Sequence, residues 1–211
     1  SYNAGLVAKY WLEDIAKISC NVEVASEYRY RRPILLNDTL FVTLSQSGET
    51  ADTVEALKAA KKINSNITSL CITNSPESSL TRLSDLTFLT HAGPEIGVAS
   101  TKAFTTQLVS LALLTCSIGR LKKSINKKQE KSIIIGLKRL PGLVNEALLQ
   151  EAQIKNLAVR FKDKNSALFL GRGTMHAIAM EGALKLKEIS YIHAEAYPAG
   201  ELKHGPIALI D

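Results

Sequence analysis

The sequence is poor in the residues that characterise disordered, fibrous and disulfide-bonded chains. Its 211 residues include only 12 Gly, 6 Pro and 3 Cys, and only 22% of them are charged. A disordered or collagen-like chain needs far more Gly, Pro or charge than this. Because 45% of the residues are hydrophobic, the chain can bury a real core. The composition therefore predicts a globular protein of one large domain or two small ones.

Long apolar runs and clustered cysteines are also lacking. The longest uncharged stretch, 104–119, is shorter than the ~20 apolar residues of a membrane span and contains several Ser and Thr. It predicts a buried helix and no membrane partner. Cys20, Cys71 and Cys116 are odd in number and widely spaced, which fits neither a disulfide framework nor a zinc site. We therefore expect a reducing compartment, the cytoplasm, and neither a metal nor another cofactor.

Positive charge is concentrated in one segment, 120–139. This segment holds eight basic residues against one acid, Glu130, although the whole chain has a net charge of only +6. A basic stripe can attract nucleic acid or an acidic membrane, but this one has no aromatic residue on which a base could stack. We interpret it as a solvated connection between helices and expect no nucleic-acid partner. A binding patch is the alternative.

Helical patterns alternate with short β-branched runs along the chain. This alternation predicts the α/β class, as a three-layer αβα sandwich in which helices cover both faces of a parallel sheet. Strands are expected at 21–24, 40–44, 67–73, 86–89 and 167–170, and helices at 5–18, 50–63, 101–118 and 176–189, with further helical pattern on both sides of Pro141 to about residue 161.

An internal repeat predicts the domain organisation. Residues 25–30 match residues 199–204 in order and type, and each copy follows a helix and a short strand. The second copy is also preceded by a strand and a glycine-rich turn, which the first copy lacks, while a strand expected at 207–210 reaches the end of the chain. We therefore expect two units, 1–140 and 141–211. The first is nearly complete but lacks its first strand, and the second is truncated.

A serine-rich loop follows the expected strand 40–44 directly, with the sequence Ser45-Gln46-Ser47-Gly48-Glu49-Thr50. Backbone N–H groups at a helix N-terminus, supplemented by three hydroxyls, can hold a phosphate, and Gly48 permits a tight turn. The alternative is an ordinary helix cap with Glu49 in the first turn. We favour an anion site, although it is not a Walker motif because the Gly-Lys-Ser/Thr ending is absent.

A second loop, 97–102, also lies between an expected strand and a helix. By itself it predicts only a helix cap. In a parallel sheet it could instead form another wall of the same pocket, because ligands bind outside the carboxyl ends of the strands.

The helix expected at 176–189 carries Glu181, Lys185 and Glu188 at spacings of four and three. At ~100° per residue these side chains share one face, as they also would in an ordinary exposed helix with an ion pair. A carboxylate beside an ammonium is also suited to proton transfer next to a carbonyl. His204 lies in a loop held by glycine and proline, where a functional and a structural role are both open.

Three stretches, 45–53, 95–104 and 181–206, closely resemble the isomerase half of the glucosamine-6-phosphate synthase family, the glutamine:fructose-6-phosphate amidotransferases. The resemblance covers essentially the whole chain. It implies two sugar-isomerase domains, each a five-stranded parallel sheet between helices. It also implies an enzyme that converts fructose 6-phosphate and glutamine to glucosamine 6-phosphate and glutamate, for amino-sugar and UDP-N-acetylglucosamine biosynthesis, in a homodimer.

The resemblance assigns a role to each site residue. The sugar phosphate is held by Ser1, Ser45, Gln46, Ser47 and Thr50, and the sugar is lined by Val98 and Ser100. Glu188 is the base that moves a proton between C1 and C2, with Lys185 and Glu181 as its neighbours. His204 helps to open the sugar ring and reaches in from the neighbouring subunit.

Two parts of the family's pattern have no counterpart in this sequence. These are the glutaminase domain with its nucleophilic cysteine, expected in the same parent chain, and the tail whose lysine forms a Schiff base with the ketose. We therefore expect the chain to be inactive by itself. The alternative function is a non-catalytic sugar-phosphate sensor, which needs only the serine-rich loop, whereas Glu188, Lys185 and His204 together favour the enzyme.

Overall fold

The computed structural model describes residues 1–97 and 99–210 and divides the chain into two compact units. Unit 1 comprises Ser1–Glu13 and Ile18–Leu114, and unit 2 comprises Asp14–Lys17 and the chain from Thr115 onward. The domain boundary expected at residue 140 falls inside helix α6 (Lys127–Leu148) and stays a prediction.

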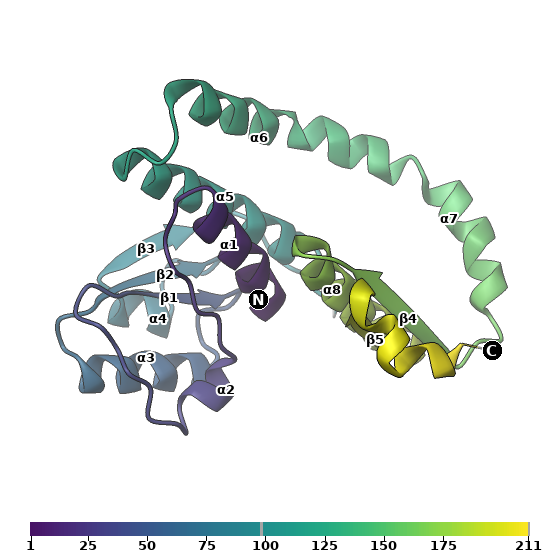
Figure 1. The fold of residues 1–211 in the computed structure, drawn as a ribbon, viewed down its shortest axis with the longest axis horizontal. Helices are drawn as coiled ribbons and strands as arrows, with labels where there is room; N and C mark the ends of the chain where they lie inside the picture. Colours follow the sequence, from purple (N-terminus) through teal and green to yellow (C-terminus); the bar gives the residue numbers. More distant parts are fainter. Residues whose placement is uncertain (98, 211) are drawn as a thin grey trace. The chain divides into compact units, whose positions relative to one another are not determined.

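Unit 1 contains a parallel sheet whose described strands are β1 (Leu40–Ser45), β2 (Thr68–Thr73) and β3 (Leu86–Leu89), in the order β1-β2-β3 (Figure 1). Leu40 pairs with Thr68, and Leu70 pairs with Leu86. In the central strand β2 every residue after Thr68 is buried, as in a parallel strand with both faces covered. The sequence therefore predicted all three strands and their parallel arrangement correctly.

Helices cover both faces of this sheet (Figure 1). They are α1 (Tyr2–Asp14), α2 (Ala25–Tyr28), α3 (Ala51–Ile63), α4 (Ser79–Leu83) and α5 (Lys102–Leu121). Leu70 and Ile72 of β2 pack against α1 and α5, whereas Cys71 between them packs against Leu57 of α3 and Leu80 of α4. Successive side chains of a strand point to opposite faces, so β2 supplies both cores. The three-layer sandwich is confirmed for unit 1.

The strand expected at 21–24 is wrong. These residues belong to no helix or strand and pair with no strand in the described part of the chain. Only Val22 is partly buried, and its side chain packs against Gly5 of α1. One partly buried apolar residue in four does not provide the alternating face that would hold a strand on a sheet.

Helix α5 is the described helix whose length and composition would allow it to cross a membrane. In the part of α5 that belongs to unit 1, up to Leu114, Leu111 is buried against the sheet and Phe104, Leu108 and Leu114 pack around it. This is the packing of a core helix, as the sequence predicted.

Unit 2 is built on two parallel strands, β4 (Ser166–Gly171) and β5 (His193–Pro198), joined by α8 (Thr174–Ser190). Gly182 of α8 lies against the ring of Phe169, where an added Cβ would be only 3.0 Å from a ring carbon. Glycine at this position therefore allows the helix to approach the strand closely. The chain continues through two 3-10 helices, η2 (Ala199–His204) and η3 (Pro206–Leu209).

The strand expected at 207–210 is also wrong. Most of these residues form η3, and Ile207, Leu209 and Ile210 are each more than half exposed. Pro206 at the first position of η3 presets a helical φ and has no N–H to give to a strand ladder.

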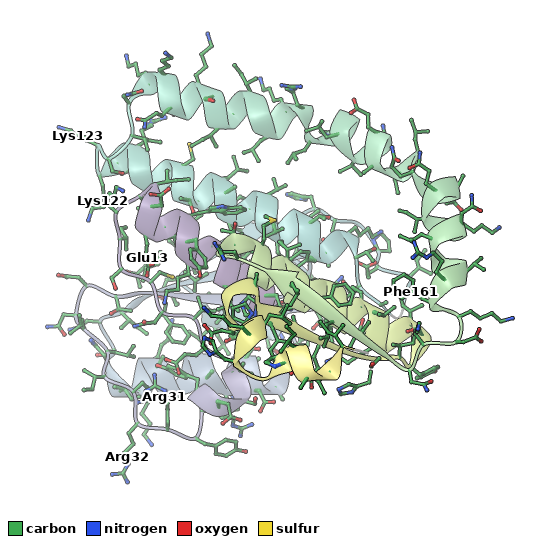
Figure 2. All side chains as sticks on the ribbon, turned by 45° about the vertical axis from the view of Figure 1, so that its right-hand side comes forward. Glu13, Arg31, Arg32, Lys122, Lys123 and Phe161 are labelled. Atoms are coloured by element: carbon green, nitrogen blue, oxygen red, sulfur yellow. The ribbon has the colours of Figure 1, made fainter. Side chains whose placement is uncertain are left out.

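Two helices and a short turn connect α5 to β4. They are α6, α7 (Glu151–Ala158) and η1 (Val159–Phe161), and none of their described residues is buried. Helix α6 begins at a capping box between Asn126 and Gln129 and continues through Pro141. At the turn before α6, Lys122 and Lys123 point outward (Figure 2). The basic residues of 120–139 are all exposed, as expected of a solvated connection, while Ile125 between them is buried.

Candidate functional site

The hydroxyls of the loop between β1 and α3 make hydrogen bonds within the loop. Ser45 Oγ accepts a hydrogen bond from the Gly48 N–H at 3.0 Å and lies 3.3 Å from Thr50 Oγ1. Ser47 Oγ accepts from the Glu49 N–H at 3.2 Å. Gly48 has φ of +69°, and a Cβ there would clash with Ser78 Oγ. Only glycine permits this turn, as the sequence indicated.

The N-terminus of α3 is arranged differently from an ordinary capped helix. Thr50 occupies the N-cap position, but the described structure gives it no side-chain cap hydrogen bond. Its hydroxyl lies beside Ser45 instead. Asp52 in the first turn is paired with Arg29, whose Nη1 is 2.7 Å from Oδ1. The helix dipole and the first-turn N–H groups can therefore interact with an anion, with the nearby carboxylate already balanced.

The second candidate loop leads into α5. Ser100 Oγ donates to Glu95 Oε2 at 3.2 Å, and the same oxygen accepts from the Ala103 N–H at 3.1 Å. Val98, the other residue expected to line the sugar, lies outside the described residues. Ser1 also reaches α5, because its Oγ accepts from Nε2 of the buried Gln107 at 2.9 Å. Helix α5 thus connects Ser1 with the loop that carries Ser100.

Asn74, which directly follows β2, ties the loops of unit 1 together. Its backbone N–H donates to the Gln46 carbonyl at 3.1 Å, and Thr73 Oγ1 donates to the same oxygen. The Asn74 side chain accepts from the Ala92 N–H through Oδ1 and donates to the Gly93 carbonyl through Nδ2, both at 2.8 Å. The loops after all three strands therefore share the carboxyl edge of the sheet, where α/β proteins bind ligands. Asn74 was not predicted as a site residue, although a polar residue directly after a buried strand is a usable signal.

The acidic and basic cluster of unit 2 lies on one face of α8, as the spacing predicted. Lys185 Nζ is 2.6 Å from Glu188 Oε2 and 3.7 Å from Glu181 Oε1. Glu181 is only 9% exposed, whereas the carboxylate of Glu188 is more accessible. An ammonium between two carboxylates, one of them accessible, can give and take a proton beside a carbonyl.

His204 closes η2 and is exposed. In the described part of the chain no hydrogen bond or ion pair joins it to the cluster on α8. The structure thus places Ser1, Ser45, Gln46, Ser47, Thr50 and Ser100 in unit 1, and Glu181, Lys185, Glu188 and His204 in unit 2. Within residues 1–97 and 99–210, no group of three His, Cys, Asp or Glu side chains is placed to hold a metal ion.

Solved structures share this fold. The C-terminal domain of glucosamine-fructose-6-phosphate aminotransferase from Francisella tularensis is 57% identical with a TM-score of 0.97, over 100% of this chain and 59% of that one. Tagatose-6-phosphate ketose/aldose isomerase from Escherichia coli is 19% identical with a TM-score of 0.70, over 100% of this chain and 56% of that one. The second likeness shows the fold alone. Both agree with the α/β class and parallel sheet expected from the sequence.

Curated relatives match the whole chain. The glutamine–fructose-6-phosphate aminotransferase [isomerizing] of Pseudomonas syringae pv. tomato is 61% identical over 211 residues, which are 100% of this chain and 34% of that protein. The protein of the same name from Haemophilus ducreyi is 59% identical with the same coverage. The chain therefore spans about a third of the length of these relatives. The family model for the SIS domain matches residues 1–117 and 160–211, most of the sequence, and the chain therefore belongs to the SIS-domain family.

Proposed function

We propose that the chain forms the sugar-phosphate isomerase part of a glutamine–fructose-6-phosphate aminotransferase. The complete protein would convert fructose 6-phosphate and glutamine to glucosamine 6-phosphate and glutamate. The observation that carries this proposal is the 61% identity, over every residue of the chain, to a relative of that name. The geometry agrees with it, because a hydroxyl-rich loop meets a helix N-terminus in unit 1 and a carboxylate-ammonium cluster lies in unit 2.

In this proposal unit 1 binds the sugar phosphate. The phosphate takes hydrogen bonds from Ser45, Ser47 and Thr50 and from the first-turn N–H groups of α3. Ser45 Oγ and Ser47 Oγ accept hydrogen bonds from backbone N–H groups within the loop, so their O–H groups are left to donate to the phosphate oxygens. Gln46 and Ser1 add further contacts to the phosphate, while Val98 and Ser100 line the sugar.

Unit 2 supplies the proton transfers. His204, contributed by the neighbouring subunit of a homodimer, helps to open the ring. Glu188 moves the proton between C1 and C2, while Lys185 stabilises the negative charge that develops on the substrate and Glu181 holds the lysine. Each carboxylate role is supported by the distances to Lys185 Nζ, 2.6 Å for Glu188 and 3.7 Å for Glu181.

The rest of the parent chain and its setting belong to the same proposal. A glutaminase domain supplies ammonia, and the reaction takes place in the cytoplasm as a step toward amino sugars and UDP-N-acetylglucosamine. The three cysteines of the chain are free thiols, which suits a reducing compartment.

The test is a product assay on the complete protein that contains this chain, paired with calorimetry. We expect fructose 6-phosphate to bind and glucosamine 6-phosphate to form from glutamine. Binding without any turnover would replace the proposal with the sugar-phosphate sensor. Absence of binding in a folded protein would overturn both.

A further inference from the structure

Glu49 lies inside the serine-rich loop, but its side chain is bound elsewhere in unit 1. Oε1 accepts from the Ser79 N–H at 2.8 Å, and Oε2 accepts from Ser79 Oγ at 2.6 Å. Arg82 Nη2 lies 3.9 Å from Oε1. These hydrogen bonds lower the pKa of the Glu49 carboxyl. The carboxylate is thus fixed at the start of α4 and does not act as a first-turn acid of α3.

Two further contacts hold the same part of the loop on α4. The Leu80 N–H donates to the Gly48 carbonyl at 3.1 Å. Ser78, which is 2% exposed and caps α4, packs so closely on Gly48 that no Cβ fits between them. Three consecutive residues, Ser78, Ser79 and Leu80, therefore fix the path of Gly48 and Glu49.

This attachment also fixes the hydroxyls that are proposed to bind the phosphate. The Gly48 and Glu49 N–H groups donate to Ser45 Oγ and Ser47 Oγ, so the position of this backbone sets the position of both side chains. A pre-set site binds more tightly because less ordering accompanies binding. The attachment also keeps a negative charge bound to its own partners, where a loose carboxylate in the loop would repel a phosphate.

We propose that Glu49 is a positioning residue for phosphate binding, acting through its paired hydrogen bonds to Ser79. The proposal rests on the proposed function, since it assumes that the loop from Ser45 to Thr50 holds the phosphate. It differs from a purely structural role in one respect. A residue that only holds α4 in place would change stability without changing the preference of the site for phosphorylated ligands.

The test uses isothermal calorimetry of the complete protein with fructose 6-phosphate, inorganic phosphate and unphosphorylated fructose. Glu49→Ala should weaken both phosphate-bearing ligands roughly tenfold, the loss expected for hydrogen bonds to a charged group, and leave fructose unchanged. Glu49→Gln can still accept from the Ser79 N–H and donate to Ser79 Oγ, so it should retain most of the affinity. Glu77→Ala removes an exposed carboxylate two residues before Ser79 and serves as the matched control.

The outcomes separate this proposal from the proposed function. If Ser47→Ala weakens fructose 6-phosphate but Glu49→Ala binds it as well as Glu77→Ala does, the positioning role is wrong and the phosphate site stands. If the unmodified protein binds no phosphorylated sugar, the proposed function itself fails. Should Glu49→Ala not fold, Ser79→Ala removes one of the two bonds from the other side, and its unchanged phosphate affinity would equally overturn the proposal.

Discussion

Lys185 and Glu188 form an ion pair at 2.6 Å within one turn of α8. The same ammonium lies 3.7 Å from Glu181, so one cation balances two carboxylates on a single helix face. Glu181 lies four residues before Lys185 and Glu188 three residues after it, the spacings at which opposite charges on a helix attract each other. Removing Glu188 leaves the pair of Lys185 and Glu181 intact, which makes Glu188 the cleaner position for a mutation.

Glu188→Gln should separate binding from chemistry in the complete protein. The amide keeps the shape of the carboxylate but cannot accept the proton, so formation of glucosamine 6-phosphate should fall by ~10² or more while fructose 6-phosphate still binds. Product formation is measured under saturating sugar, and binding by calorimetry. Full turnover by the variant would remove Glu188 from the role of base.

Ser47→Ala tests the phosphate assignment. Loss of one charge-assisted hydrogen bond should weaken fructose 6-phosphate binding by roughly 1.5 to 3 kcal/mol and leave unphosphorylated fructose almost unaffected. Ser65→Ala, at an exposed serine beyond α3, is the control. Equal losses for both sugars would show that Ser47 contacts the sugar and not its phosphate.

His204→Ala and Glu188→Gln together test whether a site is shared between subunits. If His204 acts in its neighbour's site, a mixed dimer of the two variants has one site with both mutations and one with neither. Random remixing of equal amounts should then restore about a quarter of the wild-type activity in a two-fold symmetric dimer. Each variant refolded alone is the control. Activity no higher than the sum of the parents would mean that both residues serve the site of their own subunit.

Asp85 predicts a specific loss of stability in acid. Its carboxylate accepts from the Ser69 N–H at 2.7 Å, from Ser69 Oγ at 2.6 Å and from Lys61 Nζ at 3.0 Å. The hydrogen bonds from Ser69 and then from Lys61 hold the pKa of Asp85 well below its usual range. Because the folded pKa is lowered, the contribution to stability is complete above the unfolded value of about 4 and is lost as the pH falls below it.

Thermal melts of wild type and Asp85→Asn between neutral and acid pH check this sign. The variant should be less stable at neutral pH, and the difference between the two proteins should shrink as the pH falls. Asp38→Asn, at an exposed aspartate before β1, is the control and should be as stable as wild type at every pH. A gap between wild type and Asp85→Asn that is constant with pH would contradict the linkage.

Local patterns predicted what depends on local structure. The strand at 40–44 is recognisable because its residues are apolar apart from Thr43 and do not alternate with polar ones, and the face shared by Glu181, Lys185 and Glu188 follows from helical periodicity alone. The prediction of a strand at 207–210 was wrong because an apolar run forms a strand only beside another strand, and Pro206 favours a helical turn.

Contacts between distant segments were out of reach of the same patterns. Glu49 was weighed only as a first-turn acid of its own helix, whereas the structure binds it to Ser79 of another helix. Glu95 similarly accepts the Ala103 N–H in the first turn of α5, eight residues further along the chain. Such pairings depend on how strands order themselves in the sheet, and nothing in either local segment specifies its partner.

The order of strands in unit 1 also carries a kinetic consequence. β2 meets β3 across a connection that holds only the short helix α4, so that Leu70 has to find Leu86 over a modest length of chain. β1 meets β2 across the longer α3, with Leu40 opposite Thr68. Closing the shorter connection costs less conformational entropy, so we expect β2 and β3 to pair first during folding. The connection between β2 and β3, which contains Ser79, would then fold before the loop after β1, whose Glu49 binds to Ser79.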